Sequence, residues 1–165
     1  MKYLRKALLL ATLSLSAVCN AQQQIAIFSI NDFHGAFVRN DDKGIVGAPS
    51  VWQTLDSLKT VYPCNITVSA GDNFGGSYFY NATNGVLLPV FFNDLGITVS
   101  ALGNHEFDDG QRSLAEKWTN SPLRPKNWDI TYVCANVRRN DTGAVPDFAQ
   151  PVVSVPLTLP DGRPF

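Results

Sequence analysis

The stretch Ile97-Thr-Val-Ser-Ala-Leu-Gly-Asn-His-Glu-Phe-Asp108 decides which fold this chain is predicted to adopt. Its first five residues include β-branched side chains and favour a strand. The strand pattern breaks at Gly103, and an amide, an imidazole and carboxylates follow at once. A strand that carries polar side chains at its carboxyl end is typical of layered α/β proteins, where binding sites lie at that edge of the sheet.

Two earlier segments repeat this arrangement. Residues 25–30 form an apolar run that leads into Asp32 and His34, and residues 66–70 form another that leads into Asp72. Three predicted strands therefore end in side chains that can bind a ligand or a metal ion. The chain has two histidines, and both fall in these strand-end segments. This placement indicates a function rather than three unrelated loops.

Helical periodicity separates the predicted strands. Apolar residues recur at helical spacing in residues 51–62, after Pro49, and again in residues 84–95. A third helix is expected at residues 111–118, and residues 130–137 favour a fourth strand. The alternation of strands and helices predicts right-handed crossovers and a mainly parallel sheet, which is the α/β class.

The end of the chain carries another strand signal. Residues 152–159 are strand-like, and Pro160-Asp-Gly162 is a turn signal that calls for a returning strand. Only Arg163-Pro-Phe165 follows this turn. We therefore expect the chain to be the front part of a longer protein, or a truncated one.

The first 21 residues have the pattern of a secretory signal peptide. A basic start is followed by an apolar stretch at residues 7–18 and by small residues up to Ala21. The stretch is too short for a membrane-spanning helix, and nothing later resembles one. We therefore expect residues 1–21 to be removed and residues 22–165 to form part of one domain. Export to the periplasm or the cell surface follows, with a lipoprotein attached through Cys19 as the less favoured alternative.

The composition fits a globular domain of small net charge. The 165 residues include 45% hydrophobic and 16% charged ones, which is enough apolar material for a core. The formal net charge is -1, and loss of the basic leader makes the chain more acidic. Such a chain, without Lys/Arg clusters, gives no reason to expect nucleic-acid binding. Cys64 and Cys134 either pair as a disulfide or remain buried thiols.

The side chains at the strand ends are of the types that bind hard or borderline metal ions. Asp32 and His34 stand two residues apart and can therefore point at one place, while Asp72 and Asn104 follow the other two strands. A carboxylate such as Asp72 can bridge two cations. Two ions about 3.5 to 4 Å apart would hold a phosphoryl group and activate a water near neutral pH. We predict two divalent ions, drawn from Mn, Zn, Co, Mg and Ca.

His105 is the candidate for acid–base chemistry. It follows Asn104 directly, so we expect it to face the substrate, and Asp108 can accept a hydrogen bond from its imidazole. Such a bond would orient the ring or keep it protonated. A structural interpretation also stands, in which His105 is an ordinary polar loop residue and Asp108 caps the helix that follows.

The polar blocks together resemble the signature of the calcineurin-like metallophosphoesterases. The blocks are Asp32-Phe-His-Gly35, Gly71-Asp72 and Gly103-Asn-His-Glu-Phe-Asp108, in this order. The residues around these blocks, such as Gly71-Asp-Asn-Phe-Gly-Gly-Ser77, are similar to those of the secreted bacterial 5'-nucleotidase branch. The resemblance extends over residues 25–137.

This resemblance implies a four-layered α/β/β/α core, of which the chain holds the N-terminal part. By matching position, Asp32, His34 and Asp72 would bind the first metal, and Asp72 and Asn104 the second. The family pattern continues with further histidines, none of which follows His105 in this chain. A C-terminal region is therefore expected to complete the site and to supply an aromatic clamp for the nucleobase.

For His105 and Asp108 the resemblance implies a dyad that stabilises charge on the phosphate or the leaving group. The predicted function is a metal-dependent 5'-nucleotidase that hydrolyses nucleoside monophosphates by direct attack of water. A nucleotide-sugar pyrophosphatase or a 2',3'-cyclic-nucleotide phosphodiesterase of the same fold is the close alternative. The alternative from a different class is a catalytically inactive fragment, because the metal spheres are incomplete.

Overall fold

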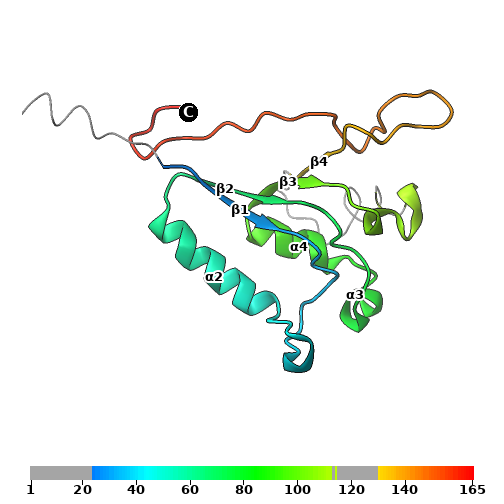
Figure 1. Ribbon diagram of the computed structural model, residues 1–165, viewed down its shortest axis with the longest axis horizontal. Coiled ribbons are helices and arrows are strands. Elements are labelled where there is room, and N and C mark those ends of the chain that lie inside the picture. Colours follow the sequence, from blue (N-terminus) through cyan, green and yellow to red (C-terminus); the bar gives the residue numbers. More distant parts are fainter. Residues whose placement is uncertain (1–23, 113, 115–129) are drawn as a thin grey trace, which may run out of the picture.

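A computed structural model of the chain describes residues 24–112, 114 and 130–165. Its centre is a four-stranded sheet in the order β1-β2-β3-β4, with every neighbouring pair parallel (Figure 1). The strands are β1 (Ala26–Ile30), β2 (Asn65–Ser69), β3 (Ile97–Ala101) and β4 (Thr131–Val133). The predicted α/β class with a parallel sheet is confirmed, and the described residues form one sheet and one helical layer of the four predicted layers.

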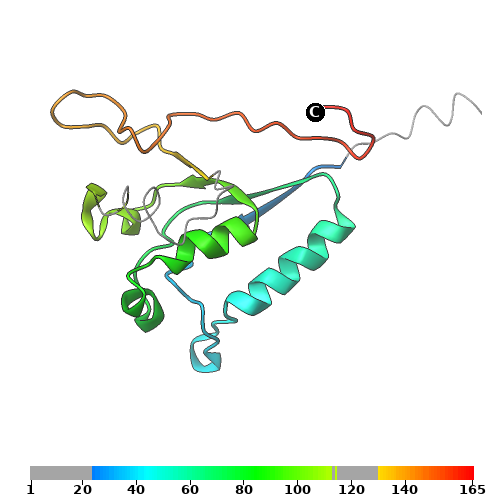
Figure 2. The same ribbon diagram turned by 180° about the vertical axis from the view of Figure 1, so that it is seen from behind.

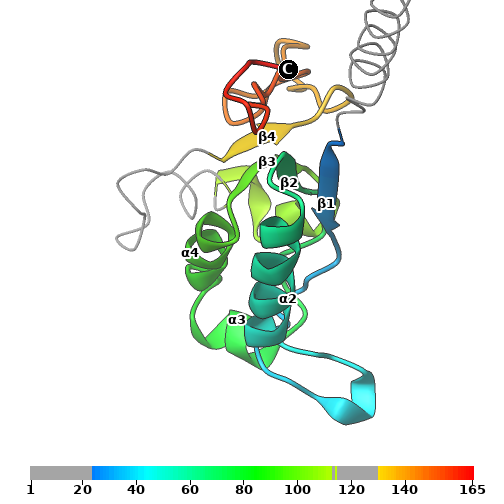
Figure 3. The ribbon, with the colours of Figure 1, turned by 90° about the vertical axis from the view of Figure 1, so that its left-hand side faces the viewer.

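Two helices cover the same face of this sheet. They are α2 (Ala48–Val61) and α4 (Leu87–Asp94), which lie side by side in the views from the front and from the side (Figures 1 and 3). Each lies in the connection between two parallel strands, and crossovers of one hand place their helices on one face. The segment after β4 runs on the opposite side of the molecule from both helices (Figures 1 and 2).

The core lies between α4, the strands and the loops that follow them. Leu88 and Phe92 of α4 are fully buried, and Leu95 and Ile97 are 1% and 2% exposed. Aromatic residues from the loops complete the core, which unites the helix with the carboxyl ends of the strands. The buried members are Phe33, Ala48, Phe74, Tyr80, Leu88, Phe92, Leu95, Ile97, Leu114 and Tyr132. This packing anchors the strand-end loops to the sheet.

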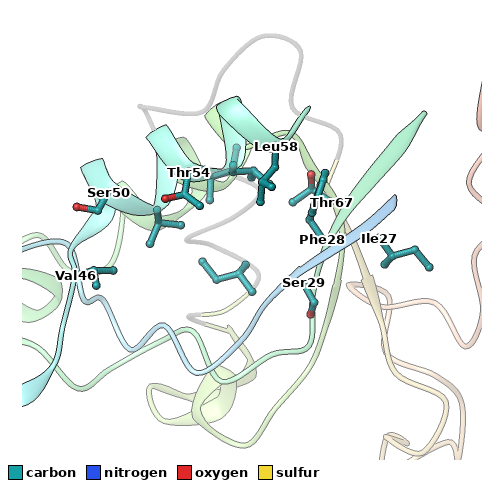
Figure 4. A pocket seen from close by; sticks show the side chains of 12 residues that line it. Ile27, Phe28, Ser29, Val46, Ser50, Thr54, Leu58 and Thr67 are labelled. Atoms are coloured by element: carbon teal, nitrogen blue, oxygen red, sulfur yellow. The ribbon is translucent and has the colours of Figure 1, made fainter. Parts of the chain in front are cut away.

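The helix predicted at residues 51–62 is confirmed as α2, which has Pro49 in its first turn and ends before Pro63. Its apolar stripe is only partly buried, since Trp52 is 47% exposed and Leu58 38%. A pocket of about 470 Å³ remains between α2 and β1, lined by residues such as Thr54 and Leu58 (Figure 4). None of the six predicted site residues lines this pocket.

The helix predicted at residues 84–95 is shorter in the structure. It begins at Leu87, because Gly85 has a φ of 70° and breaks the helical backbone. Pro89 lies in the first turn, where its missing N–H is not needed. The predicted Gly96 follows the helix with a φ of 68° and donates from its N–H to the carbonyl of Asn93.

Shorter helical turns lie in the loops. The short helix α3 was not predicted, although Ser77 marks its start by accepting a hydrogen bond from the Tyr80 N–H. The turns are α3 (Tyr78–Ala82) and the 3-10 turns η1 (Asp41–Lys43) and η2 (His105–Phe107). Most of the helix expected at residues 111–118 lies outside the described residues. The leader at residues 1–21 lies wholly outside them.

The prediction of a regular strand at residues 152–159 is wrong. This segment forms a single antiparallel bridge, between Thr158 and Pro164, and Val152 is 73% exposed. The predicted turn is present, because the Leu159 N–H donates to the carbonyl of Arg163. A strand needs a ladder of partners, and within the described part of the chain this segment has only the bridge. The fourth strand is also shorter than the predicted residues 130–137.

Cys64 and Cys134 are both buried free thiols in the structure, so the disulfide is not formed. Each lies next to a strand, Cys64 directly before β2 and Cys134 directly after β4. None of the helices in the described part of the chain combines the length and the apolar character needed to cross a membrane.

Candidate active site

The loops after β1, β2 and β3 contact one another at the carboxyl end of the sheet. The N–H of Asp32, after β1, donates to the carbonyl of Gly71, after β2, over 3.0 Å. The N–H of His105, after β3, donates to Oδ1 of Asp72 over 3.0 Å. The rings of His34 and His105 meet edge to face, with centroids 4.7 Å apart. The three predicted polar segments therefore share one place.

Three of the predicted metal ligands have a left-handed backbone. The φ angles of Asp32, His34 and Asp72 are 51°, 47° and 54°. Within the residues described, the only other non-glycine residue of this kind is Asn84. This conformation is strained for residues with a Cβ, and such strain gathers at sites where the orientation of a side chain matters. This conformation turns the chain sharply after β1 and after β2.

His34 has a defined tautomer. Its Nδ1 lies 3.1 Å from the carbonyl oxygen of Phe74, and because a carbonyl only accepts, Nδ1 carries the proton. In the neutral ring, the lone pair of Nε2 is then available to a metal ion. Nε2 lies 4.0 Å from Oδ1 of the exposed Asp32 carboxylate. The two atoms are close enough to serve one ion, as their spacing in the sequence predicts.

Asp72 lies against the third loop. Besides the His105 N–H, it contacts Gly103 so closely that a Cβ on this glycine would overlap its carboxylate. Asn104 is exposed and begins η2, but its side chain makes no capping hydrogen bond. Its amide oxygen is therefore not used by the helical turn. Asp72 and Asn104 thus belong to neighbouring segments, as expected of two ligands to a second ion.

The chemistry of these donors fits divalent cations, because carboxylate, amide and imidazole groups are the ligands that such ions prefer. The fit is partial. Nowhere in the described ranges do three or more His, Cys, Asp or Glu side chains form a group able to hold a metal ion. The four predicted ligands would by themselves fill only part of a coordination sphere, and their metal-binding role stays a prediction.

The hydrogen bond expected between His105 and Asp108 is present. Nδ1 of His105 lies 2.7 Å from Oδ2 of Asp108. Both side chains are partly exposed, 40% and 48%. The hydrogen bond to Asp108 raises the pKa of the His105 imidazole, with smaller contributions from the charges of Asp72 and Glu106. The hydrogen bond therefore favours the protonated form of the ring, which can donate to an anion.

Two further residues organise the site. Glu106 is 3% exposed and accepts hydrogen bonds from the backbone of both the second and the third loop. Ser77 donates from Oγ to the carbonyl of Gly35 over 2.7 Å and so ties α3 to the first loop. Both residues lie in the sequence blocks that resemble the family signature, but the sequence pattern predicted no role for either. A carboxylate next to a glycine-rich turn was the available signal for Glu106.

Similar proteins are known by sequence, although no family model matches the chain. An apyrase of Anopheles gambiae is 29% identical over 134 residues, which are 74% of this chain and 23% of that protein. A 5'-nucleotidase of Diplobatis ommata is 29% identical over 100 residues, which are 56% of this chain and 17% of that protein. The chain thus spans about a fifth of the length of these relatives.

Solved structures show the same fold. The NAD nucleotidase of Haemophilus influenzae aligns over 85% of this chain and 25% of its own, with a TM-score of 0.64 and 24% identity. A calcineurin-like phosphoesterase of Bacillus subtilis aligns over 86% of this chain and 45% of its own, with a TM-score of 0.60 and 18% identity. These likenesses confirm the predicted resemblance to 5'-nucleotidases and calcineurin-like phosphoesterases.

Proposed function

We propose that this chain, which has part of the fold of the calcineurin-like phosphoesterases and 5'-nucleotidases, forms part of the active site of an enzyme that hydrolyses nucleotide phosphate esters. The observation that carries the proposal is the meeting of three polar strand-end loops. His34 and His105 touch, and Asp72 accepts a hydrogen bond from the His105 backbone. The carboxyl edge of a parallel sheet is where such folds bind their substrates.

Two divalent ions complete the proposed site. Asp32, His34 and Asp72 would hold the first ion, and Asp72 with Asn104 the second. When bound, the ions lower the pKa of a water molecule and neutralise charge on the phosphate. Two observations support this assignment. Nδ1 of His34 bonds to a backbone carbonyl, which leaves Nε2 for the ion, and Nε2 lies 4.0 Å from Oδ1 of Asp32.

His105 would act on the substrate itself. Its partly exposed ring, protonated with the help of Asp108, would donate a hydrogen bond to a phosphate oxygen or a proton to the leaving group. Asp108 keeps the ring in one orientation through Nδ1, which leaves Nε2–H to face the substrate. This arrangement stabilises the negative charge that grows as the ester bond breaks.

The substrate we propose is a nucleoside 5'-monophosphate. The names of the similar proteins, apyrase and 5'-nucleotidase, support a nucleotide. A nucleotide-sugar pyrophosphatase or a 2',3'-cyclic-nucleotide phosphodiesterase is the alternative within this fold. We further propose that residues 1–21 direct export to the periplasm or the cell surface and that residues 22–165 are part of a larger catalytic domain.

A phosphate-release assay tests the proposal. The protein that contains the whole proposed catalytic domain is purified and incubated with Mn²⁺ and, in parallel reactions, with AMP, NAD, a nucleotide sugar or 2',3'-cyclic AMP. Chromatography identifies the phosphomonoester products that the phosphate measurement does not detect. We expect inorganic phosphate from AMP, its loss on removing the metal, and a large loss of turnover in His105→Ala. The absence of three-ligand clusters in the described residues favours one rival, a catalytically inactive fragment that binds metal weakly. Release of no phosphate at any Mn²⁺ concentration would select that rival.

A further inference from the structure

We infer that Glu106 is a positioning residue, whose buried carboxylate holds the loops after β2 and β3 in the arrangement that the proposed metal ligands need. The expected effect on metal binding rests on the proposed function, whereas the positioning of the two loops rests on hydrogen bonds alone. Glu106 is 3% exposed, although it carries a carboxylate and lies in the short turn η2. A buried carboxylate is tolerated only where several donors surround it.

Each oxygen of this carboxylate accepts two hydrogen bonds. Oε2 accepts from the backbone N–H of Asp72 over 2.9 Å and from that of Gly103 over 2.7 Å. Oε1 accepts from the backbone N–H of Asn73 over 2.9 Å and from its side-chain amide over 3.3 Å. Hydrogen bonds to an ionised acceptor are about twice as strong as neutral ones. Glu106 thus replaces the water that these loop donors would otherwise need.

The bonded donors flank the predicted ligands. Asp72 is itself one of the donors, and its left-handed backbone, with a φ of 54°, needs fixed neighbours to persist. Gly103 directly precedes Asn104, so the bond to its N–H fixes the start of the segment that carries the second ligand. One carboxylate therefore couples the backbones of two ligands that come from different strands.

Asn73 extends the same network into the sheet. Its side-chain amide donates to Oγ of Ser69 over 2.8 Å as well as to Glu106, and Ser69 also accepts from the Gly71 N–H. Asn73 is 1% exposed. Three backbone N–H groups and the Asn73 side-chain amide fill the four acceptor positions of Glu106. Glu106 therefore acts through Asp72 and Asn104 and does not itself touch a substrate.

Glu106→Gln is the first test, because the side chain keeps its size but turns one acceptor oxygen into a donor. In either orientation its NH₂ group then faces a backbone N–H. We expect amide hydrogen exchange at Asp72, Asn73 and Gly103 to become about tenfold faster or more in the metal-free protein. We also expect Mn²⁺ affinity, measured by calorimetry, to fall about tenfold to a hundredfold, as for other residues that orient metal ligands.

Glu106→Asp and Leu88→Ala are the comparison variants. Glu106→Asp keeps the charge with a shorter reach, so we expect an intermediate loss of both signals. Leu88→Ala removes core volume from α4 without touching the four hydrogen bonds. It is expected to lower the melting temperature and to speed amide exchange across the whole core alike, with no larger effect at the three loop amides than elsewhere and a smaller loss of Mn²⁺ affinity than in Glu106→Gln.

The outcomes separate this inference from the proposed function. If wild-type protein binds no Mn²⁺, the proposed metal site fails, while amide exchange still decides the role of Glu106. If Glu106→Gln leaves the three amides protected, or changes them no more than Leu88→Ala does, the inference is overturned. If Glu106→Gln does not fold, amide exchange in the wild type and in Glu106→Asp still tests the role of Glu106. The three loop amides must be protected in the wild type, and fast exchange there contradicts the inference.

Discussion

The imidazole rings of His34 and His105 meet edge to face with their centroids 4.7 Å apart. One ring follows β1 and the other follows β3, so the two loops approach each other across the end of the strand between them. The contact joins a predicted metal ligand to a predicted acid. It explains how residues far apart in the chain serve one site.

The pKa of His105 depends on Asp108. The hydrogen bond from Nδ1 to Oδ2 favours the protonated ring, so Asp108→Asn is expected to lower the His105 pKa toward its ordinary value of about 6.5. Because the folded-state pKa is raised, the bond stabilises the fold below pH 6.5 or so and ceases to do so as pH rises through the folded pKa. The stability of wild type and variant should therefore converge at alkaline pH.

An NMR pH titration of metal-free protein measures this pKa. The chain has two histidines, so the spectrum of a His34→Ala variant identifies the ring signals of His105. A His105 pKa that is equal in wild type and Asp108→Asn would show that the hydrogen bond in the structure has no influence on the proton.

Asp72→Asn is expected to lower Mn²⁺ affinity at least about tenfold while the melting temperature stays close to that of the wild type. The amide oxygen can still accept the His105 N–H, so the fold keeps this bond and loses only the ligand charge. Calorimetric titration with Mn²⁺ and a thermal melt check the two parts. Asp42→Asn, which removes an exposed charge from η1, is the matched control. Equal affinity in both variants would remove Asp72 from the proposed site.

Asp32→Gly is expected to abolish tight Mn²⁺ binding without lowering the melting temperature. The φ of 51° at Asp32 costs a residue with a Cβ about 1 kcal/mol, which glycine recovers and which offsets its greater chain entropy. Asp42→Gly, in the 3-10 turn η1, recovers no such strain and should lower the melting temperature by a few degrees, roughly. A larger loss in Asp32→Gly than in Asp42→Gly would contradict a strained backbone at Asp32.

Gly103→Ala is expected to weaken Mn²⁺ binding and to destabilise the protein by about 1 to 3 kcal/mol, because its methyl group would overlap the Asp72 carboxylate. Gly143→Ala is the control. At Gly143 the φ of 70° makes alanine unfavourable, but no atom lies within 4 Å of the new Cβ. It should lower the melting temperature and leave metal affinity unchanged. Denaturant unfolding and calorimetry distinguish the two, and unchanged affinity in Gly103→Ala would contradict close packing at Asp72.

Local patterns in the sequence determined most of the architecture. The runs rich in β-branched residues form β1, β2 and β3, and α2 begins near Pro49 and ends before Pro63. These signals were readable because they act between neighbours in the chain. The pairing of His105 with Asp108 was predictable for the same reason, since they lie three positions apart in the sequence. The alternation of elements was enough to predict a parallel sheet.

Only the tertiary structure decided how the site is held. The left-handed backbone of Asp72, the contact between the two histidine rings and the burial of Glu106 depend on residues from different strands. No periodicity encodes such contacts. Residues 152–159 show that a local pattern alone is not enough. They have the sequence pattern of a strand, but they form only one bridge because no neighbouring strand pairs with them in the described part of the chain. The chain alone therefore determined which polar residues end each strand, and long-range packing decided which of them meet.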